Sequence, residues 1–275
     1  MPGFPSPPIA LTIAGSDSGG GAGIQADLKS FSALGVFGAS VITAITAQNT
    51  RTVAAVEPVS PAMIAAQIDT VFGDLDVRAV KIGMLGGPDV ITVVADRLTA
   101  LLAANPIPVV LDPVMVAKSG DPLLPDEAVS ALRERLIPLA TVLTPNLPEA
   151  ARLLDRAPAQ TPDEMRAQGK ALCALGATHV LMKGGHASGE TCTDLLIGAE
   201  PLTLTAPRQH TANTHGTGCS LSSAIAAGLA QGMTVPDAAD RAHGWLQGAI
   251  AAADELAVGL GHGPVHHFHA LWRQA

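Results

Sequence analysis

The segment 213–219, Asn-Thr-His-Gly-Thr-Gly-Cys, has the composition of an anion-binding loop. It runs directly into a small and apolar stretch with helical periodicity, so we expect its last residues to begin a helix. Backbone N–H groups at such a start converge on one point, and the helix dipole adds positive potential there. We therefore predict a phosphoryl-binding site in this segment. The alternative is an ordinary loop with a helix cap.

Cys219 falls where the first turn of this helix should begin. The dipole and neighbouring donors favour a thiolate there, so the pKa of the thiol can be lowered. Such a group could accept a proton from a substrate hydroxyl or hold that hydroxyl in line. The alternative is a small, buried and unreactive cysteine. The site would not be a Walker A loop, because the chain contains no GxxxxGK[ST] pattern.

Two carboxylates, Asp112 and Glu149, stand after predicted strands and could hold a divalent cation. Mg²⁺ in enzymes takes a few carboxylates together with water and substrate phosphates. Asn146 and Glu149 also have the spacing of a capping box, in which both would only cap a helix. Asp112 precedes a proline, which is also a common turn signal. Each motif alone is therefore open to a structural interpretation.

Two lysines lie in glycine-bearing loops, Lys118 before Ser-Gly and Lys183 before Gly-Gly-His. Either ammonium group could bind nucleotide phosphates, and either could be a solvated surface lysine. The glycine cluster 15–23 lacks the GxGxxG spacing of a dinucleotide site, and no acidic residue follows it at the required distance. We expect these glycines to make room for a flat substrate.

Four histidines near the C-terminus include one pair with i, i+4 spacing: His262, His266, His267 and His269. Such a pair could bind a metal on a helix. Because no carboxylate or cysteine accompanies it, a structural role is favoured.

Apolar, β-branched runs alternate with segments of helical periodicity along the chain. This alternation predicts an α/β fold with a mostly parallel sheet covered on both faces. We expect strands at 9–14, 41–45, 77–82, 108–111, 141–143 and 179–182, and an edge hairpin of 194–197 with 202–204. We expect helices at 24–34, 61–72, 89–103, 126–136, 147–154, 162–175, 220–231 and 235–256, with a last piece from 265. The loops after the strands should meet at one edge, where ligands bind.

Composition restricts the class of protein. The 275 residues are compatible with one domain, 9–275, preceded by a proline-rich lead, 1–8, that lacks the features of a signal peptide. A net charge of -8 and 3% aromatic residues argue against nucleic-acid binding. No run of 18 apolar residues occurs, so no membrane span is expected. The three cysteines form no CxxC pair, which suits a reducing cytoplasm.

Taken in this order and spacing, several segments resemble the ribokinase-like superfamily, and within it the hydroxymethylpyrimidine/phosphomethylpyrimidine kinases. The segments that carry the resemblance are 10–17 with the glycine cluster, 23–29, 47–50, 81–85, 112–115, 146–149 and 215–219. The resemblance implies a three-layer αβα fold and two successive Mg²⁺- and ATP-dependent phosphorylations. The first would convert hydroxymethylpyrimidine to its monophosphate, and the second would give the diphosphate of thiamine biosynthesis.

The same resemblance implies roles for individual residues. Gly216, Thr217, Gly218 and Cys219 would form the anion hole, with cysteine at the position of the aspartate base of most sugar kinases. Gln48 and Asp27 would hydrogen-bond the substrate, and its pocket would be lined by Gly15, Met84 and Val114. Asp112, Thr144 and Glu149 would organise magnesium. We expect nucleotide contacts from Lys118, Asn146 and Lys183.

The nearest alternative is a pyridoxal kinase, because pyridoxal is another flat heteroaromatic ring with a hydroxymethyl group. A dual activity is compatible with the sequence. A non-catalytic sensor on a kinase scaffold is a further alternative, although the carboxylates, the anion hole and the thiol are all retained. From the family we also expect a homodimer.

Overall fold

The computed structural model describes residues 6–115, 124–185 and 189–272. Lys118, predicted to contact the nucleotide, lies outside the described residues. In the described part of the chain, no helix combines the length and apolar character that crossing a membrane requires. The prediction of a single domain after a short lead stays a prediction.

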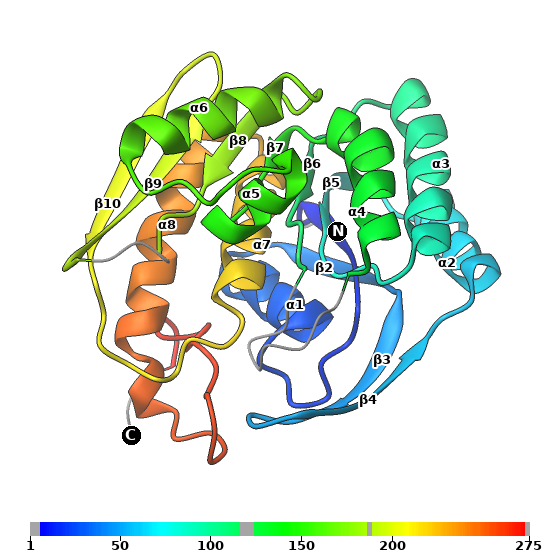
Figure 1. Ribbon diagram of the computed structural model, residues 1–275. Helices are drawn as coiled ribbons and strands as arrows, with labels where there is room; N and C mark the ends of the chain where they lie inside the picture. The colour runs from blue at the N-terminus through cyan, green and yellow to red at the C-terminus, as the bar shows by residue number, and fades with distance from the viewer. Residues whose placement is uncertain (1–5, 116–123, 186–188, 273–275) are drawn as a thin grey trace.

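One sheet of eight strands forms the centre of the molecule, in the order β10-β9-β8-β7-β6-β5-β1-β2 (Figure 1). Neighbouring strands from β2 to β8 are parallel, whereas β8, β9 and β10 pair antiparallel. Their bounds are β1 Ile9–Ala14, β2 Phe37–Ile42, β5 Val77–Ile82, β6 Val109–Leu111, β7 Val142–Leu143, β8 His179–Met182, β9 Thr191–Ile197 and β10 Leu202–Pro207. The predicted edge hairpin is therefore confirmed as β9 and β10.

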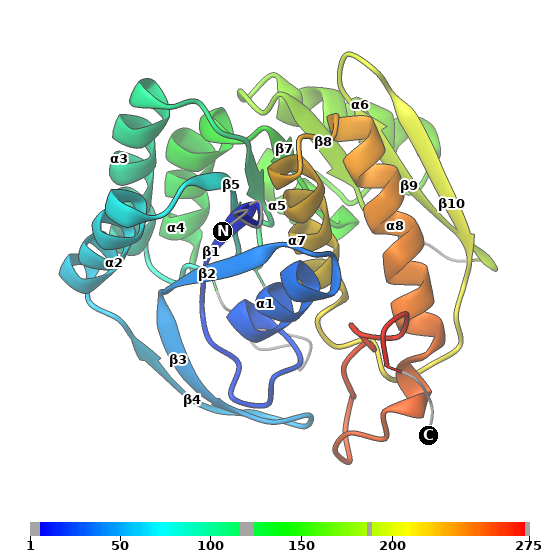
Figure 2. The ribbon, with the colours of Figure 1, turned by 180° about the vertical axis from the view of Figure 1, so that it is seen from behind.

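Helices cover both faces of this sheet, as Figures 1 and 2 show from opposite sides. One face carries α1 Gly23–Ala33, α7 Thr217–Ala230 and α8 Val235–Ala251. The other carries α2 Pro61–Asp74, α3 Pro88–Ala104, α4 Asp126–Ala131, α5 Leu147–Leu154 and α6 Pro162–Cys173. This arrangement is the predicted three-layer αβα sandwich.

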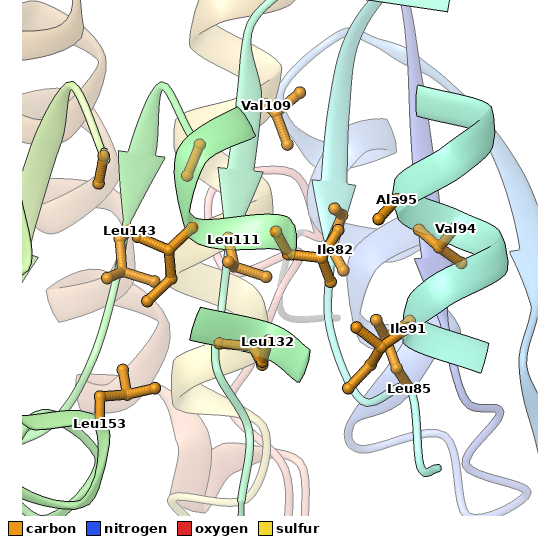
Figure 3. Close-up of a cluster of buried hydrophobic side chains, with 14 of the residues drawn as sticks. Ile82, Leu85, Ile91, Val94, Ala95, Val109, Leu111, Leu132, Leu143 and Leu153 are labelled. Carbon is orange, nitrogen blue, oxygen red and sulfur yellow. The ribbon is translucent and has the colours of Figure 1, made fainter. Parts of the chain in front are cut away.

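The core lies in two layers because successive strand residues point to opposite faces. Leu111 and Leu143 are register partners in β6 and β7, and both pack among the helices from α2 to α6 (Figure 3). Val110 and Val142, one residue earlier in each strand, pack against α1, α7 and α8. All four side chains are fully buried, so the sheet is shielded from water on both sides.

Two strands lie apart from the main sheet (Figures 1 and 2). These are β3 Ala44–Gln48 and β4 Val53–Pro58, which pair antiparallel. The prediction of one strand at 41–45 is wrong, because β2 ends at Ile42 and the chain then leaves the sheet. Strand β4 was not predicted, since most of its side chains are exposed and carry no burial pattern.

The predicted helices are confirmed except at three places. Segment 126–136 begins as α4 and continues as a π-helical turn, Leu132–Leu136. Helix α8 ends at Ala251, followed by the short 3₁₀ turn Ala253–Glu255. The helix predicted from residue 265 is wrong, because the described residues there form turns.

Candidate active site

Side chains that were predicted to belong to the site follow four neighbouring strands, at the carboxyl ends of those strands. Met84 follows β5, Asp112 follows β6, Thr144 follows β7 and Lys183 follows β8. Backbone hydrogen bonds continue the ladder past the strand ends, from Asp112 N–H to Ile82 O at 2.9 Å and from Thr144 N–H to Leu111 O at 2.9 Å. The rigid sheet therefore holds these side chains side by side.

Lys183 lies between two carboxylates. Its Nζ is 3.0 Å from Asp112 Oδ1 and 4.0 Å from Glu149 Oε2. Burial alone would lower the pKa of Lys183, but attraction to Asp112 and Glu149 raises it above its ordinary value. Burial raises the pKa of Glu149 to about 7, and the nearby Lys183 opposes that rise. The site thus contains a protonated Lys183 that faces one carboxyl oxygen of Asp112 and one of Glu149.

Hydroxyl groups orient Asp112. Thr144 Oγ1 lies 3.3 Å from Asp112 Oδ1, and Ser222 Oγ on α7 lies 3.4 Å from Asp112 Oδ2. Thr144 has no exposed surface, so its hydroxyl contacts Asp112 from the interior of the protein.

Asn146 and Glu149 form the capping box that their spacing predicted. Asn146 Oδ1 accepts from the Glu149 N–H at 2.8 Å, and Glu149 Oε2 accepts from the Asn146 N–H at 2.8 Å. A backbone hydrogen bond from Met115 also reaches the Glu149 carboxylate. Glu149 therefore caps α5 and at the same time faces Lys183 and Asp112. The predicted nucleotide contact of Asn146 stays a prediction.

The loop before α7 turns its backbone toward this group. Gly216 precedes the helix with a φ of 80°, and α7 begins at Thr217. The first N–H groups of a helix have no partner within the helix. A Cβ atom built on Gly218 would lie 3.3 Å from Lys183 Nζ and 3.5 Å from Asp112 Oδ2. The predicted anion-binding turn and the Lys183–Asp112 pair thus face the same space.

Cys219 is a free cysteine in the first turn of α7; the residue as a whole is half-buried, and its thiol points into the protein. Burial raises its pKa to about 11, although the charge of Lys81 and a hydrogen bond from the Gly23 N–H act in the opposite direction. The expectation of a lowered pKa is therefore wrong for the free protein. Removal of the sulfur from water outweighs the charge of Lys81 and the hydrogen bond from Gly23, because desolvation disfavours the charged form.

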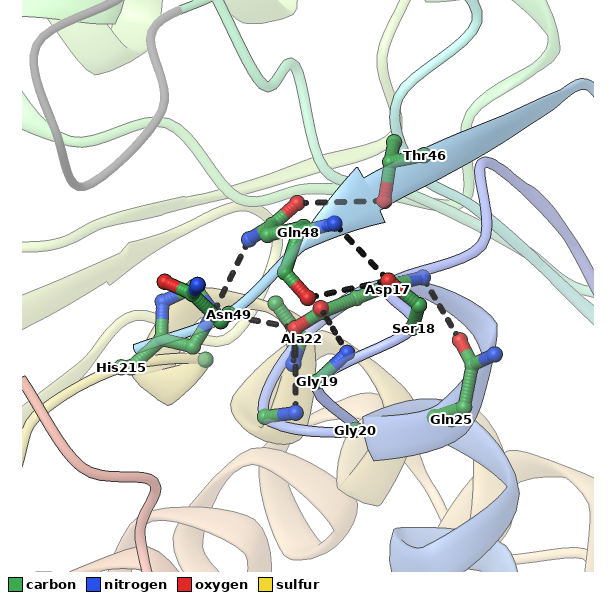
Figure 4. Close-up of polar contacts among 12 residues, drawn as sticks. Asp17, Ser18, Gly19, Gly20, Ala22, Gln25, Thr46, Gln48, Asn49 and His215 are labelled. Atoms are coloured by element: carbon green, nitrogen blue, oxygen red, sulfur yellow. Dashed lines mark hydrogen bonds and ion pairs between the residues drawn. The ribbon is translucent and has the colours of Figure 1, made fainter. Parts of the chain in front are cut away.

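The glycine cluster packs against the predicted anion-binding loop, as Figure 4 shows. A Cβ on Gly21 would collide with the ring of His215, and a Cβ on Gly23 would collide with the Gly15 carbonyl. The space beside these glycines is thus filled by protein. The expectation that they make room for a flat substrate is wrong at Gly21 and Gly23.

Asp17 ties the same two loops together. Its carboxylate accepts from the N–H groups of Gly19, Gly21 and Ala22, and it lies 3.0 Å from His215 Nε2 (Figure 4). Burial alone would raise the pKa of Asp17, but the hydrogen bonds from His215 and the backbone lower it. Sequence reasoning missed both side chains, because the signal of Asp17 is only an Asx-type turn.

Four of the residues predicted to bind substrate differ from the fifth, Asp27, which is fully buried. Gln48 is partly exposed at the end of β3, and its Nε2 lies 3.3 Å from His215 Nε2. Gly15 and Met84 are in contact, since a Cβ on Gly15 would lie 2.5 Å from Met84 Cε. Val114 is partly exposed two residues after Asp112.

Asp27 differs from its prediction. It has no exposed surface, and both carboxylate oxygens already accept hydrogen bonds from Lys81, Thr12 and Ser223. In this arrangement no oxygen of Asp27 is open to a substrate. The direct contact predicted for Asp27 is therefore replaced by an internal ion pair with Lys81, a residue whose role the sequence did not indicate.

The C-terminal histidines make packing contacts. His267 is buried, lies 2.9 Å from Ser220 Oγ and packs against Trp245. His266 packs edge-on against Trp272. Among the described residues, no group of three or more His, Cys, Asp or Glu side chains is arranged to hold a metal.

Comparison with known proteins gives the family. The family model described as phosphomethylpyrimidine kinase matches residues 17–266. A hydroxymethylpyrimidine/phosphomethylpyrimidine kinase of Rhizobium meliloti (strain 1021) is 58% identical over 266 residues, which cover 96% of this chain and 98% of that protein. The protein of the same name from Escherichia coli (strain K12) is 54% identical, with coverage of 96% and 98%.

Solved structures agree in fold. Bacillus subtilis pyridoxal kinase, in complex with ADP, superposes with a TM-score of 0.87 at 38% identity, covering 96% of this chain and 99% of that one. The phosphomethylpyrimidine kinase of Clostridium difficile 630 superposes with a TM-score of 0.77 at 45% identity, with coverage of 88% and 99%. The family resemblance and the fold class inferred from the sequence are thereby confirmed. This chain belongs to the phosphomethylpyrimidine kinase family.

Proposed function

We propose that this protein transfers the γ-phosphoryl group of ATP to 4-amino-5-hydroxymethyl-2-methylpyrimidine, and then phosphorylates the monophosphate to the diphosphate in thiamine biosynthesis. The observation that carries this proposal is that three features lie close together at the start of α7. The backbone turn at Gly218 lies beside the Lys183–Asp112 pair, and the thiol of the next residue, Cys219, interacts electrostatically with Lys183. Relatives more than half identical to this chain carry the corresponding name.

Lys183 and the first turn of α7 bind the phosphoryl group that is transferred. Phosphoryl transfer needs positioning and charge stabilisation more than covalent chemistry. A firmly protonated Lys183 supplies charge, and the N–H groups of Gly218 and Cys219 supply directed donors. Adenine-nucleotide use is supported by the Staphylococcus aureus pyridoxal kinase solved with AMP-PCP and pyridoxal, which superposes with a TM-score of 0.84 at 32% identity.

Cys219 accepts the proton that the attacking hydroxyl loses. In the free protein a thiol with a pKa of about 11 is protonated at neutral pH. Its thiolate therefore forms only when positive charge near the sulfur outweighs burial. Two ammonium groups act on Cys219 in this way, those of Lys81 and Lys183.

Magnesium fits the donor set at Asp112 and Glu149. Two carboxylates beside a phosphoryl-binding turn match the way Mg²⁺ uses a few protein oxygens, water and phosphates. Both carboxylates face Lys183, so the site already attracts positive charge. Asp112 and Glu149 would hold the ion, with Thr144 orienting Asp112. The ion would neutralise charge on the nucleotide phosphates.

The pyrimidine ring binds between the end of β3 and the ends of β1 and β5. Gln48 offers an amide donor and acceptor, which suit the amino group and ring nitrogen of an aminopyrimidine. Gly15 and Met84 form one wall, and Val114 lines the pocket from the β6 side. The partial exposure of Gln48, Met84 and Val114 supports this placement.

Pyridoxal phosphorylation is a second candidate activity. It is favoured by the superposition on Bacillus subtilis pyridoxal kinase at a TM-score of 0.87. We also propose that the protein forms a homodimer and lies in the cytoplasm. The three free cysteines, Cys173, Cys192 and Cys219, support a reducing compartment.

A substrate panel tests the function directly. Initial rates would be measured with ATP and Mg²⁺ for hydroxymethylpyrimidine, its monophosphate, pyridoxal and ribose. We expect turnover of the first two, with pyridoxal slower. Strong turnover of ribose alone would overturn the proposal.

A further inference from the structure

A fully buried ion pair lies beneath the candidate active site. Lys81 Nζ on β5 lies 2.9 and 2.8 Å from the two oxygens of Asp27 on α1, and neither side chain has exposed surface. Thr12 on β1 donates to Asp27 at 2.6 Å, and Ser223 on α7 donates at 2.7 Å. Four elements thus meet at one carboxylate.

This pair lies one helical turn from the thiol. Cys219 and Ser223 are four residues apart on α7, so they share a face of that helix. Gly23 and Asp27 have the same spacing on α1. The Gly23 N–H bonds the Cys219 sulfur, and Ser223 Oγ bonds Asp27 Oδ1. The two helices are therefore joined by successive contacts, one at the thiol and one at the ion pair.

Stability alone does not account for such a pair. Removing two charges from water is costly, and well-packed apolar replacements of buried ion pairs are often neutral or stabilising. The free energy of unfolding is therefore a weak reason for keeping Lys81 and Asp27 together. A functional reason is available, since a buried charge acts strongly on a neighbouring ionisable group.

Four charged groups from different elements act on Cys219. Lys81 and Lys183 favour its thiolate, whereas Asp27 and Asp112 oppose it. Lys81 is the cation with no exposed surface, and its ammonium also lies beside the Gly83 backbone, since a Cβ on Gly83 would be 2.6 Å from Nζ. Burial raises the pKa of the thiol, and among the four charges the effect of Lys81 on it is the largest.

We propose that Lys81 is a positioning residue for Cys219, with its buried ammonium held by Asp27 so that it stabilises the thiolate when the substrate hydroxyl is deprotonated. This inference rests on the proposed proton-accepting role of Cys219. It assigns Asp27 to the support of Lys81. It also explains why a lysine occupies a site without access to solvent or nucleotide.

Alkylation of Cys219 by iodoacetamide tests the proposal without any kinase reaction. The thiolate attacks the methylene carbon of iodoacetamide and displaces iodide, so the alkylation rate at pH 8 reports the thiolate fraction. With Cys173→Ser and Cys192→Ser in the background, Cys219 is the one remaining thiol of the chain. The decisive comparison is between two variants, one with Asp27→Asn alone and one that combines Asp27→Asn with Lys81→Gln. Both substitutions are close in shape, and neither variant contains an unpaired buried carboxylate.

We expect the double variant to react about tenfold more slowly than Asp27→Asn, as a shift of about one pKa unit would produce. Lys170→Gln in the Asp27→Asn background is the matched control, because Lys170 is exposed on α6. That control should react at the rate of Asp27→Asn. Rates of the double variant within twofold of Asp27→Asn would overturn the proposal.

Asp27→Asn alone gives a second test that does not depend on the folding of the double variant. It removes the negative charge and keeps the lysine, so alkylation should be faster than in the parent protein. An alkylation rate equal to that of the parent protein, with the fold intact by circular dichroism, would mean that the pair only holds α1 against α7 and would overturn the proposal. Because no ATP or pyrimidine is present, this result is independent of whether the proposed substrate is correct.

Discussion

The carbonyl oxygen of Gly21 fills the space that a Cβ atom on Gly216 would need. This contact brings the glycine cluster and the predicted anion-binding loop together, and it requires glycine at residue 216. The φ of 80° at Gly216 requires glycine for a second reason, since a side chain is strained in that conformation. The geometry of the predicted anion-binding turn thus depends on a residue almost two hundred positions earlier in the chain.

Alanine substitutions at Gly216 and Gly218 should have different effects, the first on stability and the second on activity. Gly216→Ala should lower the thermal midpoint, because strain and collision act together in the folded state. Gly218→Ala should keep a near-normal midpoint, since its Cβ would lie 3.3 Å from Lys183 Nζ with no backbone atom closer. It should nevertheless lose phosphorylation, because the methyl group would project into the proposed anion site. Calorimetry and initial rates measured together separate the two cases, and full activity of Gly218→Ala would contradict the placement of the site.

Cys219→Ala should remain folded and bind ATP, because the backbone N–H groups survive. We expect kcat to fall by about 10²- to 10⁴-fold, the range for loss of a general base. Cys219→Asp should recover part of the rate, since a carboxylate can also accept a proton. If the alanine variant stays within about threefold of the parent kcat, Cys219 is a packing residue and the base lies elsewhere.

Glu149→Gln should raise the Mg²⁺ concentration needed for half-maximal rate, because one of the two carboxylates facing Lys183 is lost. The parent protein should be inactive in excess EDTA and recover with Mg²⁺ or Mn²⁺. Glu164→Gln is the matched control, since Glu164 forms the same capping box with Thr161 on α6, away from the site. Losing a cap alone costs about 1 kcal/mol of stability. An equal metal requirement in both variants would leave Glu149 with a capping role only.

Gln48→Ala should reduce kcat/KM for hydroxymethylpyrimidine more than for pyridoxal. An unpaired polar group on the buried ring costs roughly 1–3 kcal/mol, and pyridoxal presents a different edge. Asn49→Ala is the control, because Asn49 Oδ1 shapes the adjacent turn by accepting from the N–H groups of Arg51 and Thr52. Equal losses on both substrates in Gln48→Ala would mean that Gln48 supports the loop without reading the ring.

His267 should make the protein less stable as the pH falls below about 6.5. Burial, followed by the charges of Lys29 and His266, lowers its pKa to about 3 in the folded state. The unfolded chain therefore binds the proton first, and stability present above pH 6.5 is lost toward pH 3. By pH 5 the loss amounts to about 2 kcal/mol.

The test is the stability difference between pH 7 and pH 5, measured by urea unfolding. His267→Gln removes the titration and keeps an amide that can donate to Ser220, so this difference should shrink by about 2 kcal/mol. His210→Gln, at an exposed histidine, should leave it unchanged. An unchanged pH dependence in His267→Gln would place the sensitive group elsewhere.

Local signals in the sequence were enough to predict most of the helices and strands. Thr161 and Glu164 start α6 with a capping box, and Asn146 and Glu149 start α5 in the same way. Such boxes and the periodicity of apolar residues act within one or two helical turns, so they can be read from the chain alone. Strand β4 lacked a comparable signal, because its side chains are exposed and its partner β3 has left the main sheet.

The sequence by itself determined the family pattern, the α/β architecture and the loops that carry Asp112, Lys183 and Cys219. Only the tertiary structure decided the electrostatic state of these groups. The raised pKa of Cys219, the buried partner of Asp27 and the contact of His215 with Asp17 all join distant parts of the chain. The physical reason is that desolvation and Coulomb attraction depend on distance in space and on access to water, and neither is a property of residue order.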